Sequence, residues 1–266
     1  MLFLIILSGF NWFFEILKWQ TLVSFVKTIS FKNALEQSLG ALTASLLTPN
    51  RIGEYGAKAI YYSTTFRKKI VLLNLMGNVM QMSMTVLFGC VGIIIFVQTY
   101  PIEVDLFKIG KFITILIIVS LFAFFIVQDK NFKIKGYSIN DVLNFYKKIP
   151  YFKLFLSSIL CFLRYIIFSF QWYYLLQIFG VNVTYLNAMV VITTMYFFAS
   201  IIPTIFIFDV VVKGSVAVYL FSIVGVNELT ILCIIMTMWL LNVVLPSVFG
   251  SYYVLNFNFS KDSNLT

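Results

Sequence analysis

The chain contains no histidine, which removes the commonest general base and the commonest metal ligand in proteins. Its three cysteines, Cys90, Cys161 and Cys233, are scattered singly through apolar segments. We expect them to be small packed side chains, not disulfide partners or metal ligands. The sequence also lacks a glycine-rich phosphate loop and a nucleophile elbow. We therefore expect no metal and no cofactor, and no catalytic motif points to an enzyme.

Charge is scarce as well, since only 11% of the 266 residues are charged while 61% are hydrophobic. Soluble domains do not have this composition, so the sequence predicts an all-α, polytopic membrane protein. The longest polar run, 128–153, is too short for a soluble domain, and we expect 1–266 to be a single integral membrane domain. Met1 is followed by neither a basic region nor a cleavage site, which predicts no cleavable signal peptide.

The formal net charge of +9 could suggest a nucleic-acid partner, but the basic residues are not arranged for one. Fourteen of the nineteen Lys and Arg residues fall in three connectors between apolar runs, 18–33, 51–69 and 128–153. This distribution is the positive-inside signature, so it predicts cytoplasmic connectors in a cell membrane and no nucleic-acid binding. Within the third connector, Ile139–Ile149 has the spacing of a short interfacial helix. The polar tail 256–266 is expected to be frayed.

About five apolar stretches are long enough to span a bilayer in full. They are 1–18, 70–98, 111–127, 154–179 and 229–254. In the last of them, Asn242 and Pro246 predict a kink near the middle. In the second, small and polar residues share one helical stripe, which favours helix packing over a cavity wall. These residues are Asn74, Asn78, Gln81, Thr85, Gly89 and Gly92.

Another apolar stretch, ASLLTPNRIGEYGAKAIYY at Ala44–Tyr62, is broken at a Thr-Pro pair. We expect Thr48 to cap a helix that begins at Pro49. Glu54 and Lys58 then share a helix face at i,i+4, whereas Arg51 has no obvious partner nearby. Only about fourteen weakly polar residues precede the break, too few to cross a bilayer. The pattern therefore predicts a re-entrant hairpin.

A similar break recurs at Ser200–Pro203, where Asp209 and Lys213 follow with the same i,i+4 spacing. Basic connectors bracket the first break, and three predicted spans separate it from the second. We therefore predict re-entrant hairpins at Ala34–Tyr61 and Met189–Phe221 that enter from opposite sides. This is the inverted-repeat plan of many transporters, whose sites lie between the repeats near the bilayer midplane.

Three stretches, LLTPNRIGEYGAKAIYY, IIPTIFIFDVVVKGSVAVYLFSIVGVNE and LLNVVLPSVFG, resemble the flippase-like membrane region of lysylphosphatidylglycerol synthases. The resemblance covers roughly Phe10–Leu255. It implies translocation of a phospholipid or lipid-linked substrate, without the aminoacyl-transferring domain of the full synthases. In the second stretch, the family's Gly-rich segment and Arg-Glu are replaced by Ile205–Asp209. The family pattern of Thr-Pro, a basic residue, Gly-Glu and a further basic residue is matched here by Thr48-Pro49, Arg51, Gly53-Glu54 and Lys58.

Arg164 lies about eleven residues into its predicted span, roughly 16 Å along a helix. A charge at that depth needs an acidic partner or water, and Glu54, Asp209 and Glu15 are the candidates. With a helix N-terminus, such cations could receive the phosphate of an anionic phospholipid or lipid-linked substrate. The candidate binding site comprises Thr48, Pro49, Arg51, Gly53, Glu54, Lys58, Arg164, Asp209 and Lys213.

Other interpretations stay open at this point. The two i,i+4 ion pairs could serve only to lock helices together. The chain could also be a membrane-embedded transferase in envelope lipid or glycan synthesis, with Glu103 and Asp105 as the nearest pair of acids. It could finally be a scaffold subunit that binds an envelope-synthesis protein, in which case its charged membrane residues would tolerate neutral substitution.

Overall fold

The computed structural model describes residues 1–100, 133–134, 137–202 and 204–257. Its residues fall into two compact units, one formed by Met1–Tyr100 with Phe152–Thr266 and one by Pro101–Tyr151. The described residues are almost entirely helical. Four of their helices are long and apolar enough to cross a membrane: Leu2–Val23, Thr64–Thr99, Tyr151–Ile178 and Glu228–Leu255. The expectation of an all-helical protein with several helices able to cross a membrane is confirmed, whereas the number of spans and the inverted repeat stay predictions. The predicted span 111–127, with Glu103 and Asp105 before it, lies outside the described residues.

The smaller unit contains a short hairpin and a helix. Strands β1 (Lys133–Ile134) and β2 (Tyr137–Ser138) pair antiparallel, and α6 (Ile139–Lys147) follows directly. Asp141 lies in the first turn of α6 and Lys147 in its last turn, a placement that suits the helix dipole. The short helix predicted over 139–149 is therefore present.

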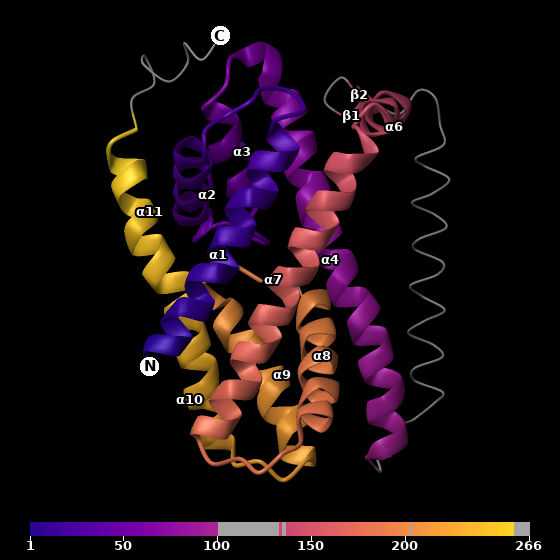
Figure 1. Cartoon of the computed structure of the whole chain (residues 1–266), viewed down its shortest axis with the longest axis vertical. Coiled ribbons are helices and arrows are strands. Elements are labelled where there is room, and N and C mark those ends of the chain that lie inside the picture. Colours follow the sequence, from indigo (N-terminus) through magenta and orange to yellow (C-terminus); the bar gives the residue numbers. More distant parts are fainter. Residues whose placement is uncertain (101–132, 135–136, 203, 258–266) are drawn as a thin grey trace. The chain divides into compact units, whose positions relative to one another are not determined.

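The long helices of the larger unit run along its length in Figure 1. They are α1 (Leu2–Val23), α4 (Thr64–Thr99), α7 (Tyr151–Ile178) and the composite of α10 (Glu228–Trp239), η2 (Leu240–Val244) and α11 (Leu245–Leu255). The sequence placed a connector at 18–33, but α1 continues through this point to Val23. Cys90 and Cys233 are exposed, so of the three cysteines only Cys161 is the packed side chain that was expected.

The composite helix has an irregular middle where a kink was predicted. Residues 240–244 form a π-helical turn. Pro246 has no N–H, so the carbonyl of Asn242, four residues earlier, loses its helical donor. Trp12 of α1 replaces that donor, because its Nε1 lies 3.1 Å from the backbone carbonyl oxygen of Asn242 and donates to it. The Ser8 hydroxyl likewise donates to the Leu241 carbonyl at 2.6 Å. Helix α1 thus satisfies the backbone groups that the proline and the π turn release.

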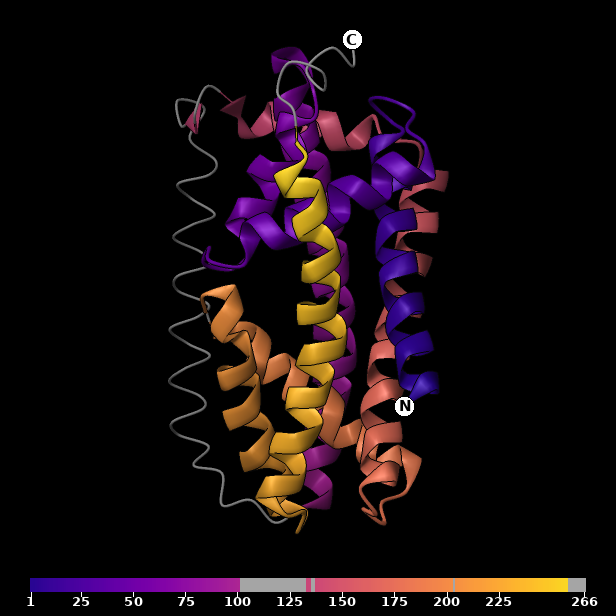
Figure 2. The ribbon, with the colours of Figure 1, turned by 90° about the vertical axis from the view of Figure 1, so that its left-hand side faces the viewer.

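Two pairs of short helices complete the larger unit. The first hairpin consists of α2 (Phe31–Ser45) and α3 (Ile52–Ile60), and the second of α8 (Tyr185–Ile201) and α9 (Asp209–Ile223), with the 3-10 turn η1 (Phe206–Phe208) before α9. Figures 1 and 2 show the two hairpins at opposite ends of the unit, with their breaks facing each other between them.

The two breaks are hydrogen-bonded to each other. The Asn50 amide donates to the Thr204 carbonyl at 2.8 Å, and the Thr204 amide donates to the Asn50 side-chain oxygen at 3.1 Å. The Ile207 amide donates to the Leu46 carbonyl at 3.0 Å. Backbone groups freed where each helix stops are therefore satisfied by the other hairpin, as an apolar environment requires. We call this the tip contact.

Glycines allow the close helix crossings around the hairpins. A Cβ on Gly89 of α4 would lie 2.5 Å from the Cβ of Phe197 in α8, and one on Gly92 would lie 2.1 Å from the Thr193 hydroxyl. A Cβ on Gly250 of α11 would lie 2.2 Å from a carbonyl oxygen of α2. The packing role predicted for the glycines of the α4 stripe is confirmed.

Candidate functional site

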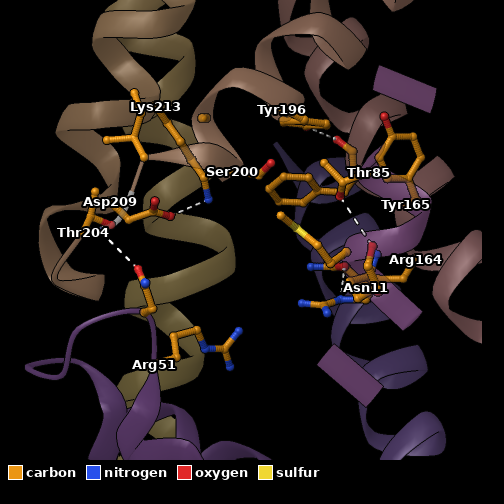
Figure 3. A pocket seen from close by; sticks show the side chains of 16 residues that line it. Asn11, Arg51, Thr85, Arg164, Tyr165, Tyr196, Ser200, Thr204, Asp209 and Lys213 are labelled. Atoms are coloured by element: carbon orange, nitrogen blue, oxygen red, sulfur yellow. Dashed lines mark hydrogen bonds and ion pairs between the residues drawn. The ribbon is translucent and has the colours of Figure 1, made fainter. Parts of the chain in front are cut away.

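A cavity of about 410 Å³ lies beside the tip contact in the larger unit (Figure 3). Both hairpins contribute to its wall, together with α1, α4 and α7. Its neutral polar side chains are amides and hydroxyls, among them Asn11, Asn50, Gln81, Thr85, Ser200 and Thr204. Of the described residues that line it, the charged ones are Arg51, Arg164, Asp209 and Lys213. Four of the nine predicted site residues therefore line one cavity.

Arg51 comes from the tip of the first hairpin. Asn50 and Arg51 have φ values of 46° and 59°, the left-handed conformation that non-glycine residues rarely adopt. The helix begins at Ile52 with Arg51 as its N-cap, so the start predicted at Pro49 was wrong. The turn through these two residues delays the helix and aims Arg51 at the cavity. The Thr48 hydroxyl still caps the turn, because it accepts the Gly53 amide at 3.0 Å.

Arg51 also has a partner, contrary to the expectation from the sequence. Its Nη2 lies 2.9 Å from Glu54 Oε2, while Glu54 Oε1 lies 2.7 Å from Lys58 Nζ. The side chains of Glu54 and Lys58 are only 2% exposed, so this pair lies behind the cavity wall. Lys58 also donates to Asn74 at 2.8 Å and sits 4.3 Å from the ring centroid of Trp19. The pair thus holds α3 against α4 and α1.

Arg164 projects from α7 on the facing wall, next to Asn11 (Figure 3). Its Nη1 lies 2.6 Å from Glu15 Oε2, and its Nε donates to Asn11 at 3.0 Å. Glu15 is thus the partner among the three candidates. Lys18, which the sequence placed in a basic connector, is buried in α1, with its Nζ 2.6 Å from the same Glu15 oxygen. The i,i+3 spacing of Glu15 and Lys18 was the available signal for this pair.

A buried amide chain supports Arg164 from behind, and the sequence did not reveal it. Asn11 Nδ2 donates to the Asn242 side chain at 2.9 Å, and Asn242 Nδ2 donates to Gln171 at 3.0 Å. Gln171 in turn donates to the Leu4 carbonyl at 3.2 Å. Because these amides satisfy one another, they fix the orientation of the Asn11 oxygen that receives the arginine.

Asp209 and Lys213 come from the start of α9, and they form an ion pair at i,i+4 as predicted. The Asp209 side chain is 19% exposed and the Lys213 side chain 40%. This pair therefore faces the open cavity, unlike Glu54 and Lys58. Figure 3 shows it on the same side of the cavity as Arg51, opposite Arg164.

The remaining predicted residues support the site without lining the cavity. Thr48 and Gly53 shape the tip, where a Cβ on Gly53 would lie 2.9 Å from the Thr48 methyl group. Pro49 forms an isolated antiparallel bridge with Ile205 of the other hairpin. The hairpin tips therefore set both the position of Arg51 and the boundary of the cavity.

Comparisons of the chain with protein-family models, with curated proteins and with solved structures gave no match. Function is therefore inferred from the geometry of the cavity.

Proposed function

We propose that the protein is a flippase-like membrane protein that binds an anionic lipid head group in this cavity and moves it between leaflets. The observation that carries the proposal is a cavity with arginines on two facing walls, inside a unit of four apolar helices long enough to cross a bilayer. Cationic residues at membrane depth mark substrate paths more often than structural sites, because their burial is costly. An arginine can also grip a phosphate through two parallel hydrogen bonds.

The proposed topology has five full spans and two re-entrant hairpins in an inverted repeat. The four apolar helices would be four of these spans, and residues 111–127 would form the fifth. The cationic connectors 51–69 and 128–153 would lie in the cytoplasm, so the first hairpin would open to that side and the second to the outside. Labelling of single cysteines near Lys32 and Lys68 tests this. Both positions should react from the cytoplasmic side, and reaction from opposite sides would contradict it.

Movement of the head group would require the tip contact to open. The contact joins the two breaks through backbone hydrogen bonds, and the cavity lies directly beside it. If the hairpins face opposite sides, this contact forms the barrier between the two leaflets. A few hydrogen bonds between short helices can part and re-form without unfolding the long helices, which suits an alternating-access cycle.

The resemblance to the membrane region of lysylphosphatidylglycerol synthases agrees with this proposal. Its first motif supplies Arg51 at the cavity and Thr48, Gly53 and Glu54 around the tip. We therefore propose phospholipids or lipid-linked anions of the cell envelope as substrates.

The first test is substitution of Arg51. In reconstituted vesicles, Arg51→Ala should lower the rate of leaflet transfer of an anionic lipid by about tenfold or more, since one charged hydrogen-bonding partner is lost. The amount of folded protein should change little, because Glu54 keeps Lys58 as a partner. Arg51→Lys should leave a partial defect, because lysine keeps the charge and loses the planar fork.

Lys32→Ala serves as the matched control, because it removes one positive charge from an exposed position in α2. It should transfer lipid like the wild type. Wild-type vesicles that show no transfer above protein-free vesicles, together with unchanged leaflet composition in cells lacking the protein, would refute the proposal.

A further inference from the structure

Helices α9 and α10 are joined by a short turn that ties them together. Gly225 has a φ of 79°, the left-handed conformation in which helices commonly end. The Val226 amide then donates to the Phe221 carbonyl at 3.0 Å. The Asn227 side chain caps α10, because it accepts a backbone amide of this helix at 2.9 Å. The two helices also pack against each other, so they form one piece, residues 209–239, which we call the α9–α10 pair.

The α9–α10 pair is attached to the rest of the unit at two irregular segments. The 3-10 turn η1 precedes α9, and the π turn at 240–244 follows α10. Irregular turns of these kinds often mark a functional hinge. Beyond them the helices are closely packed. Helix α8 crosses α4 at Gly89 and Gly92, and α11 is bonded to α2, where the Thr43 hydroxyl donates to the Ser247 carbonyl at 2.9 Å.

A small cavity of about 50 Å³ lies between the α9–α10 pair and helices α7 and α8. Ile235 and Trp239 line it on the side of the pair, and Trp172 and Met195 line it on the other side. The Trp239 indole N–H is buried, and it has no hydrogen-bond partner among the described residues. A buried indole normally has one, because an unpaired donor in apolar surroundings costs free energy. This interface is therefore incompletely packed, and the pair has room to shift.

Asn242, in the π turn, connects the α9–α10 pair to two neighbouring helices. Its Nδ2 donates to the Met238 carbonyl at the end of α10 and to Gln171 of α7, at 3.1 and 3.0 Å. Its Oδ1 accepts from Asn11 of α1 at 2.9 Å, and its backbone carbonyl accepts from Trp12 of the same helix. One buried residue therefore holds the end of the pair against α1 and α7.

On the basis of the proposed function, we propose that the α9–α10 pair turns as one piece about η1 and the π turn when the head group moves between leaflets. Asn242 is the positioning residue that holds the pair in the conformation described above. The Ile207 amide of η1 donates to the Leu46 carbonyl of the first hairpin. Turning of the pair would pull this bond apart, so the tip contact would open in the same movement.

The cavity is linked to this hold through Asn11. Asn11 donates to Asn242 and accepts Arg164 Nε at 3.0 Å. A head group that draws Arg164 toward the centre of the cavity would take this donor from Asn11 and weaken the support of Asn242. The α9–α10 pair carries Asp209 and Lys213 on the opposite wall. Binding at one wall would therefore release movement of the other.

The test measures distances between spin labels on the full chain in phospholipid vesicles, with the three native cysteines replaced by serine. Leu229→Cys in α10 with Val97→Cys in α4 reports on the α9–α10 pair relative to a helix outside it. Two control combinations stay within one part: Leu229→Cys with Tyr219→Cys in α9, and Val97→Cys with Ile178→Cys in α7. All four positions are exposed. Only the first distance should have a second population, which is the minor one in the resting chain.

Removing support from the π turn should enlarge the second population. Trp12→Phe keeps an aromatic ring and loses the N–H bonded to the Asn242 carbonyl, so the ratio of second to first population should rise about threefold to tenfold. Asn242→Leu should raise it by about tenfold or more. Pro246→Ala gives the turn a backbone donor and should lower it. Trp19→Phe is the matched control, because this other buried tryptophan of α1 donates to Gln37 of α2, and it should leave the ratio unchanged.

One unchanged distance in both Trp12→Phe and Asn242→Leu, or an equal rise in Trp19→Phe, would overturn the inference. Trp12→Phe decides the matter where Asn242→Leu does not fold. Lipid transfer is measured in the same vesicles. Transfer without a second population in any variant would overturn the movement and leave the proposed function standing. A second population that follows these variants in vesicles without transfer would support the movement and count against the proposed function.

Discussion

The two hairpins have the same arrangement of helices, but the ion pair of the first is buried and that of the second is partly exposed. In the first hairpin, Glu54 and Lys58 are almost fully buried and bonded to neighbouring helices. In the second, Asp209 and Lys213 form the same i,i+4 pair at an open cavity wall. A buried pair fixes its helix, because separating it would leave a charge without a partner. A half-exposed pair contributes little to stability and can exchange partners with a ligand.

The surrounding packing shows the same difference. Gln37 of the first hairpin is buried and accepts hydrogen bonds from Trp19 at 2.8 Å and Tyr62 at 2.9 Å. In the second hairpin, Val211 and Tyr219 of α9 are about 60% exposed. We infer that the first hairpin is the fixed part of the site and that α9 of the second hairpin is the part that moves.

Locking the two hairpins together should have the largest effect. Pro49 and Ile205 form an antiparallel bridge, and Cα atoms in such pairs are about 4.5 to 5.5 Å apart, within the range of a disulfide. In a variant in which serine replaces Cys90, Cys161 and Cys233, Pro49→Cys with Ile205→Cys should lose nearly all leaflet transfer on oxidation. Reduction should restore it.

The Pro49→Cys single variant is the control for the lock, and oxidation should not change its rate. If the oxidised double variant transfers lipid as fast as the same variant after reduction, the hairpin tips need not separate during transfer.

Replacing the lysine of each ion pair should reduce the free energy of unfolding more in the first hairpin than in the second. Lys58→Met should lower the free energy of unfolding by about 1.5 to 3 kcal/mol, because the charged hydrogen bonds to Glu54 and Asn74 are lost while Glu54 keeps Arg51 as a partner. Lys213→Met should lower it by less than about 1 kcal/mol, because its pair is partly exposed. Denaturant unfolding in micelles measures both values. Equal losses would mean that the second hairpin is as firmly fixed as the first.

Replacing a glycine by alanine should reveal a smaller difference in stability between the packing around the first hairpin and that around the second. Gly250→Ala should cost about 1 to 3 kcal/mol, because the new Cβ would overlap a carbonyl oxygen of α2 in the first hairpin. Gly214→Ala in α9 meets only Ile235 at 3.8 Å and should be neutral or stabilise by about 0.5 to 1 kcal/mol. Thermal unfolding of both variants provides the comparison. Destabilisation by Gly214→Ala would show that α9 is packed more tightly than its exposed residues indicate.

The sequence by itself determined the features that depend on neighbours along the chain. Composition indicated an all-helical membrane protein, and the breaks near Pro49 and Pro203 marked where short helices end. The spacing of Asp209 and Lys213 predicted their ion pair, because residues four apart share a face of any helix. Asn242 and Pro246 predicted an irregular helix, because proline removes a hydrogen bond wherever it stands.

Only the tertiary structure decided which distant residues meet. The Arg164–Glu15 pair joins residues 149 positions apart, and three carboxylates were equally good partners from the sequence. From the sequence, Lys18 is expected to be a connector residue, but in the structure it is buried, with its side-chain stem beside Gly77 of α4. The tip contact has no sequence signature, because any free carbonyl can accept from any free amide. Periodicity fixes partners within one helix, whereas partners on different helices depend on how all the helices pack.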